Sequence, residues 1–146
     1  MFKSKWNIVL VLAACALLLA TTVSAKKQVE RPFNIRGDVT VVFAPYYAWA
    51  TGVATHTGKY RSEAIVEGKA ILTAANGDQL FWTEDIGTDP LNPLAFTMTC
   101  TIYGGTGRFL DASGSFGPVI IPYSELIYNE DGSISFSYSA SGTITY

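Results

Sequence analysis

The sequence predicts an all-β protein, and two observations carry this prediction. β-Branched and aromatic residues occur in short runs that are broken by Gly, Pro, Asn and Asp. After the first 25 residues, no segment has an apolar repeat of helical period long enough to indicate a helix. Eight runs of this kind, separated by turn residues, favour a closed barrel or a sandwich. We expect strands at 35–43, 47–56, 60–67, 69–75, 79–85, 96–103, 113–121 and 133–146.

The last predicted strand has the clearest pattern. From Ile134 to Tyr146 the even positions hold apolar residues or glycine, and the odd positions hold serine or threonine. A period of two places all the apolar groups on one face of a strand. The same alternation runs from Phe96 to Ile102, with Cys100 in the apolar set. Cys100 is therefore predicted to be a buried thiol and not a nucleophile.

The first 25 residues have the features of a cleavable signal peptide. Lys3 and Lys5 precede an apolar run over 8–20, and Val23-Ser24-Ala25 supplies small residues for cleavage. The alternative, an uncleaved membrane anchor, is disfavoured because the run is shorter than the ~18–20 residues that span a bilayer. We expect a secreted or periplasmic protein with a loose arm at 26–34 and one β-barrel domain at 35–146.

The leader also contains Leu12-Ala13-Ala14-Cys15, which looks like a lipobox, although the apolar run continues beyond it. Lipidation at Cys15 would tether the domain to a membrane. Otherwise cleavage leaves Cys100 alone, so no internal disulfide can form.

Charge and composition exclude several functions. Removing Lys3 and Lys5 takes the formal charge from −2 to −4, and Arg108 is the only basic residue from Gly77 onward. Nucleic acid is therefore not an expected partner. The chain has one histidine, His56, and no His-x-x-x-His spacing, so we expect no metal site and no cofactor. His56 is predicted to lie in an exposed turn, with general-base work as the alternative.

Asn76-Gly77 indicates a β-hairpin with a two-residue turn. Counting outward from this turn pairs Leu72 with Phe81, Ile71 with Trp82, and Lys69 with Glu84. Both faces of the hairpin then carry apolar side chains, which favours a homo-oligomer. The segment 87–93, with two prolines, is predicted to be an exposed loop.

A second glycine-rich turn carries a family resemblance. The stretch Gly104-Gly105-Thr106-Gly107-Arg108-Phe109, followed by Ala112-Ser113-Gly114, resembles one in plant dirigent proteins and, more loosely, in allene oxide cyclases. Together with 70–81, it makes the chain similar to bacterial secreted members of the allene-oxide-cyclase-like barrels. This resemblance implies an eight-stranded antiparallel barrel with a lumen, often assembled as a trimer. It assigns no catalytic residue to this chain.

Five residues are candidates for ligand binding. Tyr47 and Trp49, in the aromatic run at 46–49, line a lumen in one interpretation and fill a core in the other. Trp82 and Glu84 share a face, so Glu84 is either a carboxylate with a raised pKa in an aromatic pocket or the ion-pair partner of Lys69, which the register favours. Arg108 is either an anchor for an anionic ligand or a surface partner of Asp111.

The leading functional hypothesis is a secreted or periplasmic barrel that holds a small hydrophobic or aromatic ligand in its lumen. The first alternative is a cyclase or isomerase that uses Glu84 or Arg108; a hydrolase is unsupported because no Gly-x-Ser-x-Gly occurs. The second alternative is a small outer-membrane barrel, since the chain ends on an alternating strand and the aromatic Tyr146.

Overall fold

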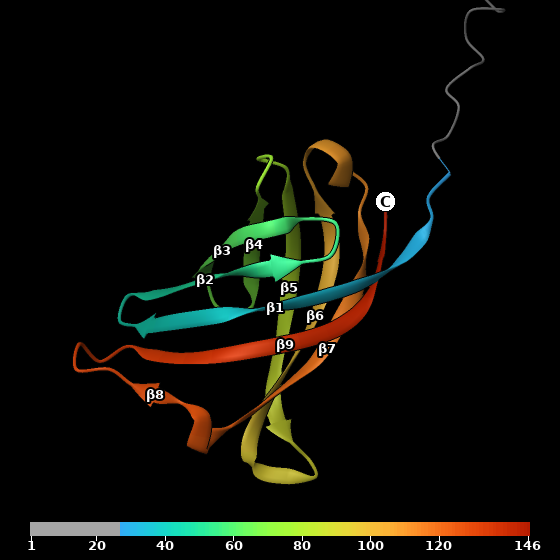
Figure 1. Ribbon diagram of the computed structural model, residues 1–146. Coiled ribbons are helices and arrows are strands. Elements are labelled where there is room, and N and C mark those ends of the chain that lie inside the picture. The colour runs from blue at the N-terminus through green and yellow to red at the C-terminus, as the bar shows by residue number, and fades with distance from the viewer. Residues whose placement is uncertain (1–26) are drawn as a thin grey trace, which may run out of the picture.

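The protein is a closed antiparallel β-barrel of eight strands (Figure 1). The computed structural model describes residues 27–146; the predicted signal peptide, with Cys15, lies outside them. Neighbouring strands follow the chain from β1 to β7, β9 closes the barrel by pairing with both β7 and β1, and the short β8 pairs with β9 only. The elements are β1 (Glu30–Phe43), β2 (Tyr46–Ala54), β3 (Gly58–Val66), β4 (Lys69–Ala74), β5 (Gln79–Asp89), β6 (Asn92–Gly105), the 3₁₀ turn η1 (Gly107–Phe109), β7 (Ser113–Pro122), the 3₁₀ turn η2 (Tyr123–Glu125), β8 (Ile127–Tyr128) and β9 (Ile134–Thr145).

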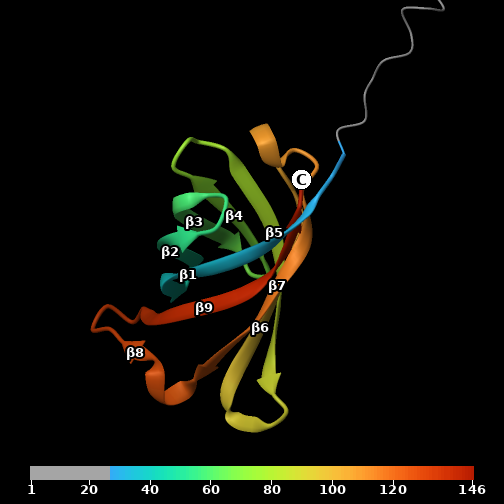
Figure 2. The same ribbon diagram turned by 45° about the vertical axis from the view of Figure 1, so that its right-hand side comes forward.

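All eight predicted strands are present, and strand structure extends into two segments for which the sequence predicts an irregular conformation. β1 begins at Glu30, so most of the predicted arm at 26–34 is strand. This part of β1 pairs with β9, and Arg31 lies opposite Ile144. The predicted exposed loop at 87–93 is shorter than expected, because β5 ends at Asp89 and β6 begins at Asn92. There β5 and β6 continue as a hairpin with Gly87 opposite Thr97, and Figure 2 shows this hairpin projecting from the barrel.

The predicted register of the β4–β5 hairpin is wrong by one residue. The loop has three residues, because the amide of Gly77 donates to the carbonyl of Ala74 at 2.9 Å and Gly77 adopts a φ of 88°. This is a turn closed by a glycine bulge, which inserts one residue relative to a two-residue turn. Leu72 therefore faces Leu80, and Lys69 faces Thr83.

This correction changes which side chains point inward. A slip of one residue moves a strand's side chains to the opposite face relative to its partner. Leu72, Leu80 and Trp82 are buried inside the barrel, whereas Ile71 and Phe81 point outward. Apolar groups still occupy both faces of the hairpin, and the homo-oligomer inferred from them stays a prediction.

The two ends of the barrel are filled differently. At one end, large side chains close the interior completely: Phe33, Leu72, Leu80, Phe109 and Ile144 are each 0% exposed. Phe109 enters from η1. Toward the other end the inward positions of β2, β3 and β4 hold alanines, namely Ala48, Ala50, Ala64 and Ala70. These small side chains leave space that larger residues would fill.

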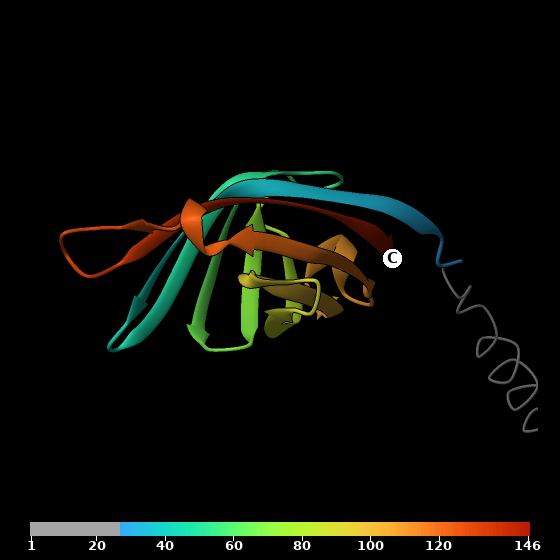
Figure 3. The ribbon, with the colours of Figure 1, turned by 90° about the horizontal axis from the view of Figure 1, so that it is seen from below.

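The pairing around the barrel is uneven at β9. β9 pairs with β1 along almost its whole length, from Glu30 opposite Thr145 to Val41 opposite Ile134. Its pairing with β7 covers only Ser113–Phe116. Beyond Phe116, β7 follows β6 away from β9, and the chain returns through η2 and β8 (Figures 1 and 3). The barrel is therefore splayed on the side of its alanine-lined end.

Candidate functional site

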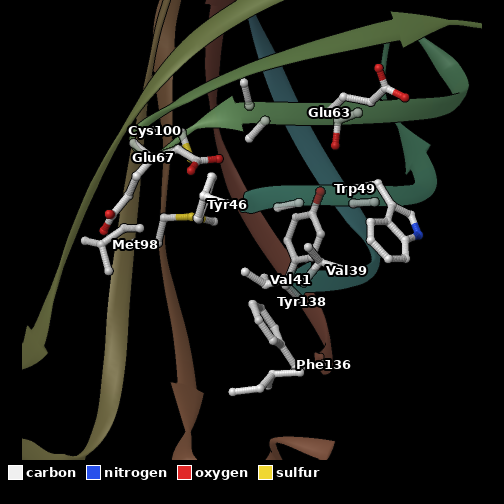
Figure 4. Close-up of a pocket in the computed structure, with 18 of the residues that line it drawn as sticks. Val39, Val41, Tyr46, Trp49, Glu63, Glu67, Met98, Cys100, Phe136 and Tyr138 are labelled. Carbon is white, nitrogen blue, oxygen red and sulfur yellow. The ribbon is translucent and has the colours of Figure 1, made fainter. Parts of the chain in front are cut away.

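The alanine-lined end of the barrel contains a cavity of about 290 Å³. Its walls are mostly apolar and aromatic, and they come from β1–β7, β9 and the segment before β8. Figure 4 shows Tyr46, Met98 and Cys100 grouped on one side of the cavity, and Val41, Phe136 and Tyr138 on the other. The rings of Phe96 and Phe136 meet with centroids 5.3 Å apart, on a stretch of β9 that does not pair with β7.

Glu84 brings a carboxyl group into this apolar space. It follows Trp82 by two residues on β5, so both side chains point into the barrel, and both line the cavity. The indole Nε1 of Trp82 donates a hydrogen bond to Glu84 Oε1 at 3.1 Å. Burial raises the pKa of Glu84 above its ordinary value of 4.5, against the smaller opposing effect of the Trp82 hydrogen bond.

Two other groups in the cavity wall are held in their neutral forms. Burial, and then the neighbouring charge of Glu84, raise the pKa of the Cys100 thiol well above its ordinary value of 9.0. Cys100 lies opposite Glu84 in the β5–β6 pairing and is 0% exposed, which confirms the buried thiol. Burial, followed by Glu84 and Glu67, raises the pKa of Tyr46 above 10.0. A protonated thiol is a poor nucleophile, so covalent chemistry at Cys100 has no support.

A pair of tyrosines forms the floor between the cavity and the filled end. The hydroxyls of Tyr60 and Tyr138 lie 2.5 Å apart, and the Tyr60 hydroxyl also donates to the carbonyl of Arg36 at 3.3 Å. Burial raises the pKa of both phenols. The two residues sit on β3 and β9, and between them lie Gly37 and Gly52, which face each other on β1 and β2. The missing side chains of the glycines let the two phenols meet.

Tyr47 and Trp49, two of the predicted ligand-binding residues, point away from the lumen. Their neighbours Ala48 and Ala50 take the buried inward positions of β2. The two rings stack on each other with centroids 5.4 Å apart, and the Tyr47 hydroxyl donates to Glu63 Oε1 at 3.0 Å. Trp49 and Glu63 border the cavity only at its edge, and Figure 4 shows them set apart from Tyr46, Met98 and Cys100.

Arg108 lies at the filled end of the barrel and does not line the cavity. Its Nε is 3.5 Å from Asp78 Oδ2, its guanidinium donates to the carbonyl of His56, and it lies over the ring of Phe109. The predicted pairing with Asp111 is therefore wrong, and Arg108 instead fastens two turns to η1. His56 adopts a φ of 69° in one of those turns, where its Nε2 lies 2.9 Å from the carbonyl oxygen of Pro32.

The predicted ion pair between Lys69 and Glu84 is wrong as well. It depended on a two-residue turn, and the extra residue of the loop places Lys69 opposite Thr83 on the outer face. Trp82 and Glu84 are thus the two predicted site residues that the structure brings together in the cavity.

The sequence does not indicate most of the residues of the cavity wall. The inward faces that the alternation predicts include Phe96, Met98, Phe136 and Tyr138, but nothing in their spacing distinguishes a lumen from a filled core. The available signal was the small size of the inward residues Ala48, Ala50, Ala64 and Ala70, on neighbouring strands. A run of alanines at facing inward positions indicates space, and the strand register is needed to see it.

Comparisons with known proteins do not identify a relative of this chain. No family model, no curated protein and no solved structure matches the chain. Across residues 27–146 no helix has the length and apolar character needed to cross a membrane. In the same range, no three His, Cys, Asp or Glu side chains gather as metal ligands. The site therefore has to be interpreted from its own geometry, which is an apolar cavity with one inward carboxyl group.

Proposed function

We propose that this protein is a small binding barrel that holds a hydrophobic or aromatic molecule in its alanine-lined cavity. The observation that carries the proposal is the contrast between the two ends of one barrel. One end is filled by side chains such as Phe33 and Phe109, and the other retains about 290 Å³. This volume is roughly twice the ~150 Å³ apolar cavity that accepts benzene, so a ligand with two fused rings fits the space.

The closed barrel of eight strands also supports the resemblance to allene-oxide-cyclase-like barrels. The outward residues support a water-soluble barrel over an outer-membrane one. Outward positions of β1, β3 and β9 carry Arg36, Asp38, Arg61 and the serines from Ser135 to Ser141, while the lumen is apolar. A membrane-spanning barrel requires the opposite arrangement, with an apolar band facing lipid.

The test is calorimetric titration with 2-naphthylmethanol, a neutral two-ring probe. We expect saturable binding, with a dissociation constant on the order of 100 µM or tighter, and a negative heat-capacity change. Ala64→Leu adds three carbon atoms to the cavity wall and should abolish binding. Ala75→Leu, at an exposed position in the β4–β5 loop, is the matched control and should bind like the wild type. No saturable heat, or equal binding by Ala64→Leu, overturns the proposal.

Export is part of the proposal and rests on the leader over 1–25. Expression of the whole chain in a bacterium, followed by intact-mass measurement, tests it. We expect a product that begins at Lys26. An N-terminal acylated cysteine would instead indicate processing at Cys15, and an uncleaved product would contradict export by a cleavable signal.

A second candidate function is an isomerase-type enzyme, which Glu84 favours. A carboxyl group with a raised pKa inside an apolar cavity suits proton transfer to and from carbon. The test is incubation with 2-tetralone in D₂O. An enzyme of this kind would exchange the α-protons faster than buffer does, and Glu84→Gln would lose the acceleration. Exchange at the buffer rate removes this candidate.

A further inference from the structure

The cavity has an electrostatic asymmetry that a purely apolar site would lack. Glu84 lies in the wall of the cavity. Glu67, whose side chain is exposed, lies at its rim. Among the described residues that line the cavity, none is Lys, Arg or His. A ligand that enters therefore meets acidic groups and no cation.

Glu84 has bonding capacity left for a ligand. Within residues 27–146, the side chain of Glu84 accepts a hydrogen bond from Trp82 Nε1 at Oε1. A carboxylate accepts at both oxygens, so Oε2 remains able to accept from a donor in the cavity. Within residues 27–146 the ion pairs join Arg61 to Glu63 and Arg108 to Asp78, and none of them neutralises Glu84.

Aromatic rings surround the same space. Tyr46, Trp82, Phe96, Phe136 and Tyr138 all line the cavity. The faces of such rings carry partial negative charge and attract organic cations, most strongly where water is excluded. Apolar walls, aromatic faces and one carboxylate together match a molecule with an apolar body and a protonated amine.

We propose that the cavity selects a hydrophobic amine, with the ammonium group bound at Glu84, and rejects carboxylates of the same shape. This inference rests on the proposed binding function and adds the chemical class of the ligand. A carboxylate ligand would be placed near Glu84 with no cation to compensate either charge, so it pays desolvation without an attractive partner. An ammonium group gains a charge-assisted hydrogen bond in the same position.

The test compares three probes that share one ring system: 2-naphthylmethylamine, 2-naphthylmethanol and 2-naphthoate. Each is titrated calorimetrically into the protein at pH 7.5 and low salt. We expect the amine to bind at least about tenfold more tightly than the alcohol, and the carboxylate more weakly than both. Glu84→Gln should remove the preference for the amine and leave the affinity for the alcohol within about twofold, because Gln retains the acceptor for Trp82.

Asp85→Asn is the matched control, since Asp85 neighbours Glu84 on β5 but points outward and is exposed. It should keep the wild-type preference, which excludes a general effect of net charge. Equal binding of carboxylate and amine, or an unchanged amine-to-alcohol ratio in Glu84→Gln, overturns the inference and leaves the binding function standing. Failure of all three probes to bind overturns the proposed function itself.

Discussion

At the scale of single residues, glycine and aromatic side chains act together inside this barrel. Tyr60 and Tyr138 meet over Gly37 and Gly52, which occupy the inward positions of the two strands between them. Phe33 and Phe116 meet in the same way over Gly142, with ring centroids 5.3 Å apart. An aromatic side chain that covers an inward glycine shields its backbone and fixes the strand register. These two contacts pack Tyr138 and Phe116, which line the cavity, against their neighbours Tyr60 and Phe33.

The first prediction concerns the close approach at Gly52. A Cβ there would overlap the carbonyl oxygen of Arg36 and lie 2.7 Å from Gly37 Cα, so Gly52→Ala should lower the free energy of unfolding by about 3 kcal/mol. Gly87→Ala is the matched control on β5, because its nearest contact is the Thr97 hydroxyl at 3.8 Å. The control should be unchanged or more stable by about 0.5 kcal/mol. Urea denaturation measures both, and equal stabilities would contradict the steric explanation.

The second prediction concerns the tyrosine pair. Tyr60→Phe removes the hydroxyl that pairs with the buried Tyr138 hydroxyl, and it should lower the free energy of unfolding by about 1–3 kcal/mol. Tyr138→Phe should cost less, since the Tyr60 hydroxyl keeps the carbonyl of Arg36. The double variant should lose much less than the sum of the single losses, because no unpaired hydroxyl remains. Additive losses in a double-mutant cycle would show that the hydroxyls do not interact.

At the scale of strands, alternation assigned the inward faces of β6 and β9 correctly, and turn chemistry misassigned the β4–β5 pairing. Asn76-Gly77 suits a two-residue turn and also a three-residue loop with Gly77 at the bulge. A two-residue turn and a three-residue loop place different residues opposite Glu84. One residue of loop length therefore decides whether Glu84 faces Lys69 as an ion-pair partner or contributes a carboxylate to the cavity. The strand pattern alone does not contain this information.

The third prediction follows from the short pairing of β7 with β9. From Gly142 to Thr145, β9 has strand partners on both sides, whereas residues 137–141 have β1 on one side only. We expect consistent amide protection over 142–145 and alternating protection over 137–141, because every second amide there lacks a ladder partner. Residue-resolved hydrogen exchange by NMR measures this. Uniform protection over 137–141 would mean that another strand covers this edge.

At the scale of the whole molecule, the barrel combines a packed end with a cavity that contains a carboxyl group. The packed end supplies the stability that lets the other end stay unfilled, since each fully buried large side chain contributes about 1.5–3 kcal/mol. Keeping Glu84 in the cavity works against this stability once the group ionises. Stability and function often compete at a site, and the proposed binding role of Glu84 would account for a carboxyl group at this destabilising position.

The fourth prediction gives the pH dependence of that cost. The folded state raises the pKa of Glu84 above 4.5, so the unfolded chain releases this proton at lower pH than the folded protein does. The contribution of Glu84 is fully favourable below about pH 4.5 and is lost as pH rises through its folded pKa. The stability of Glu84→Gln relative to the wild type should therefore increase with pH from about 4.5. Thermal unfolding across this range measures the difference, and a constant difference would contradict it.

The groups that face Glu84 do not reverse this sign. Cys100 on β6, Tyr46 on β2 and Tyr138 on β9 have raised pKa values and stay neutral in this range. Glu67, at the turn after β3, carries the same charge as Glu84, while β1 and β7 contribute the apolar residues Val39, Val41 and Phe116. No cation among these lining residues compensates Glu84.

The sequence by itself determined the fold class, the eight strands of the barrel, the inward faces of β6 and β9, and the burial of Cys100. These features depend on local alternation and turn residues, which act over a few positions along the chain. Only the tertiary structure decided the β4–β5 register, the outward direction of Tyr47 and Trp49, and the place of Arg108 at the filled end. It alone also revealed the cavity around Glu84. Empty space depends on which side chains from distant strands face one another, and the residue pattern along the chain does not contain that information.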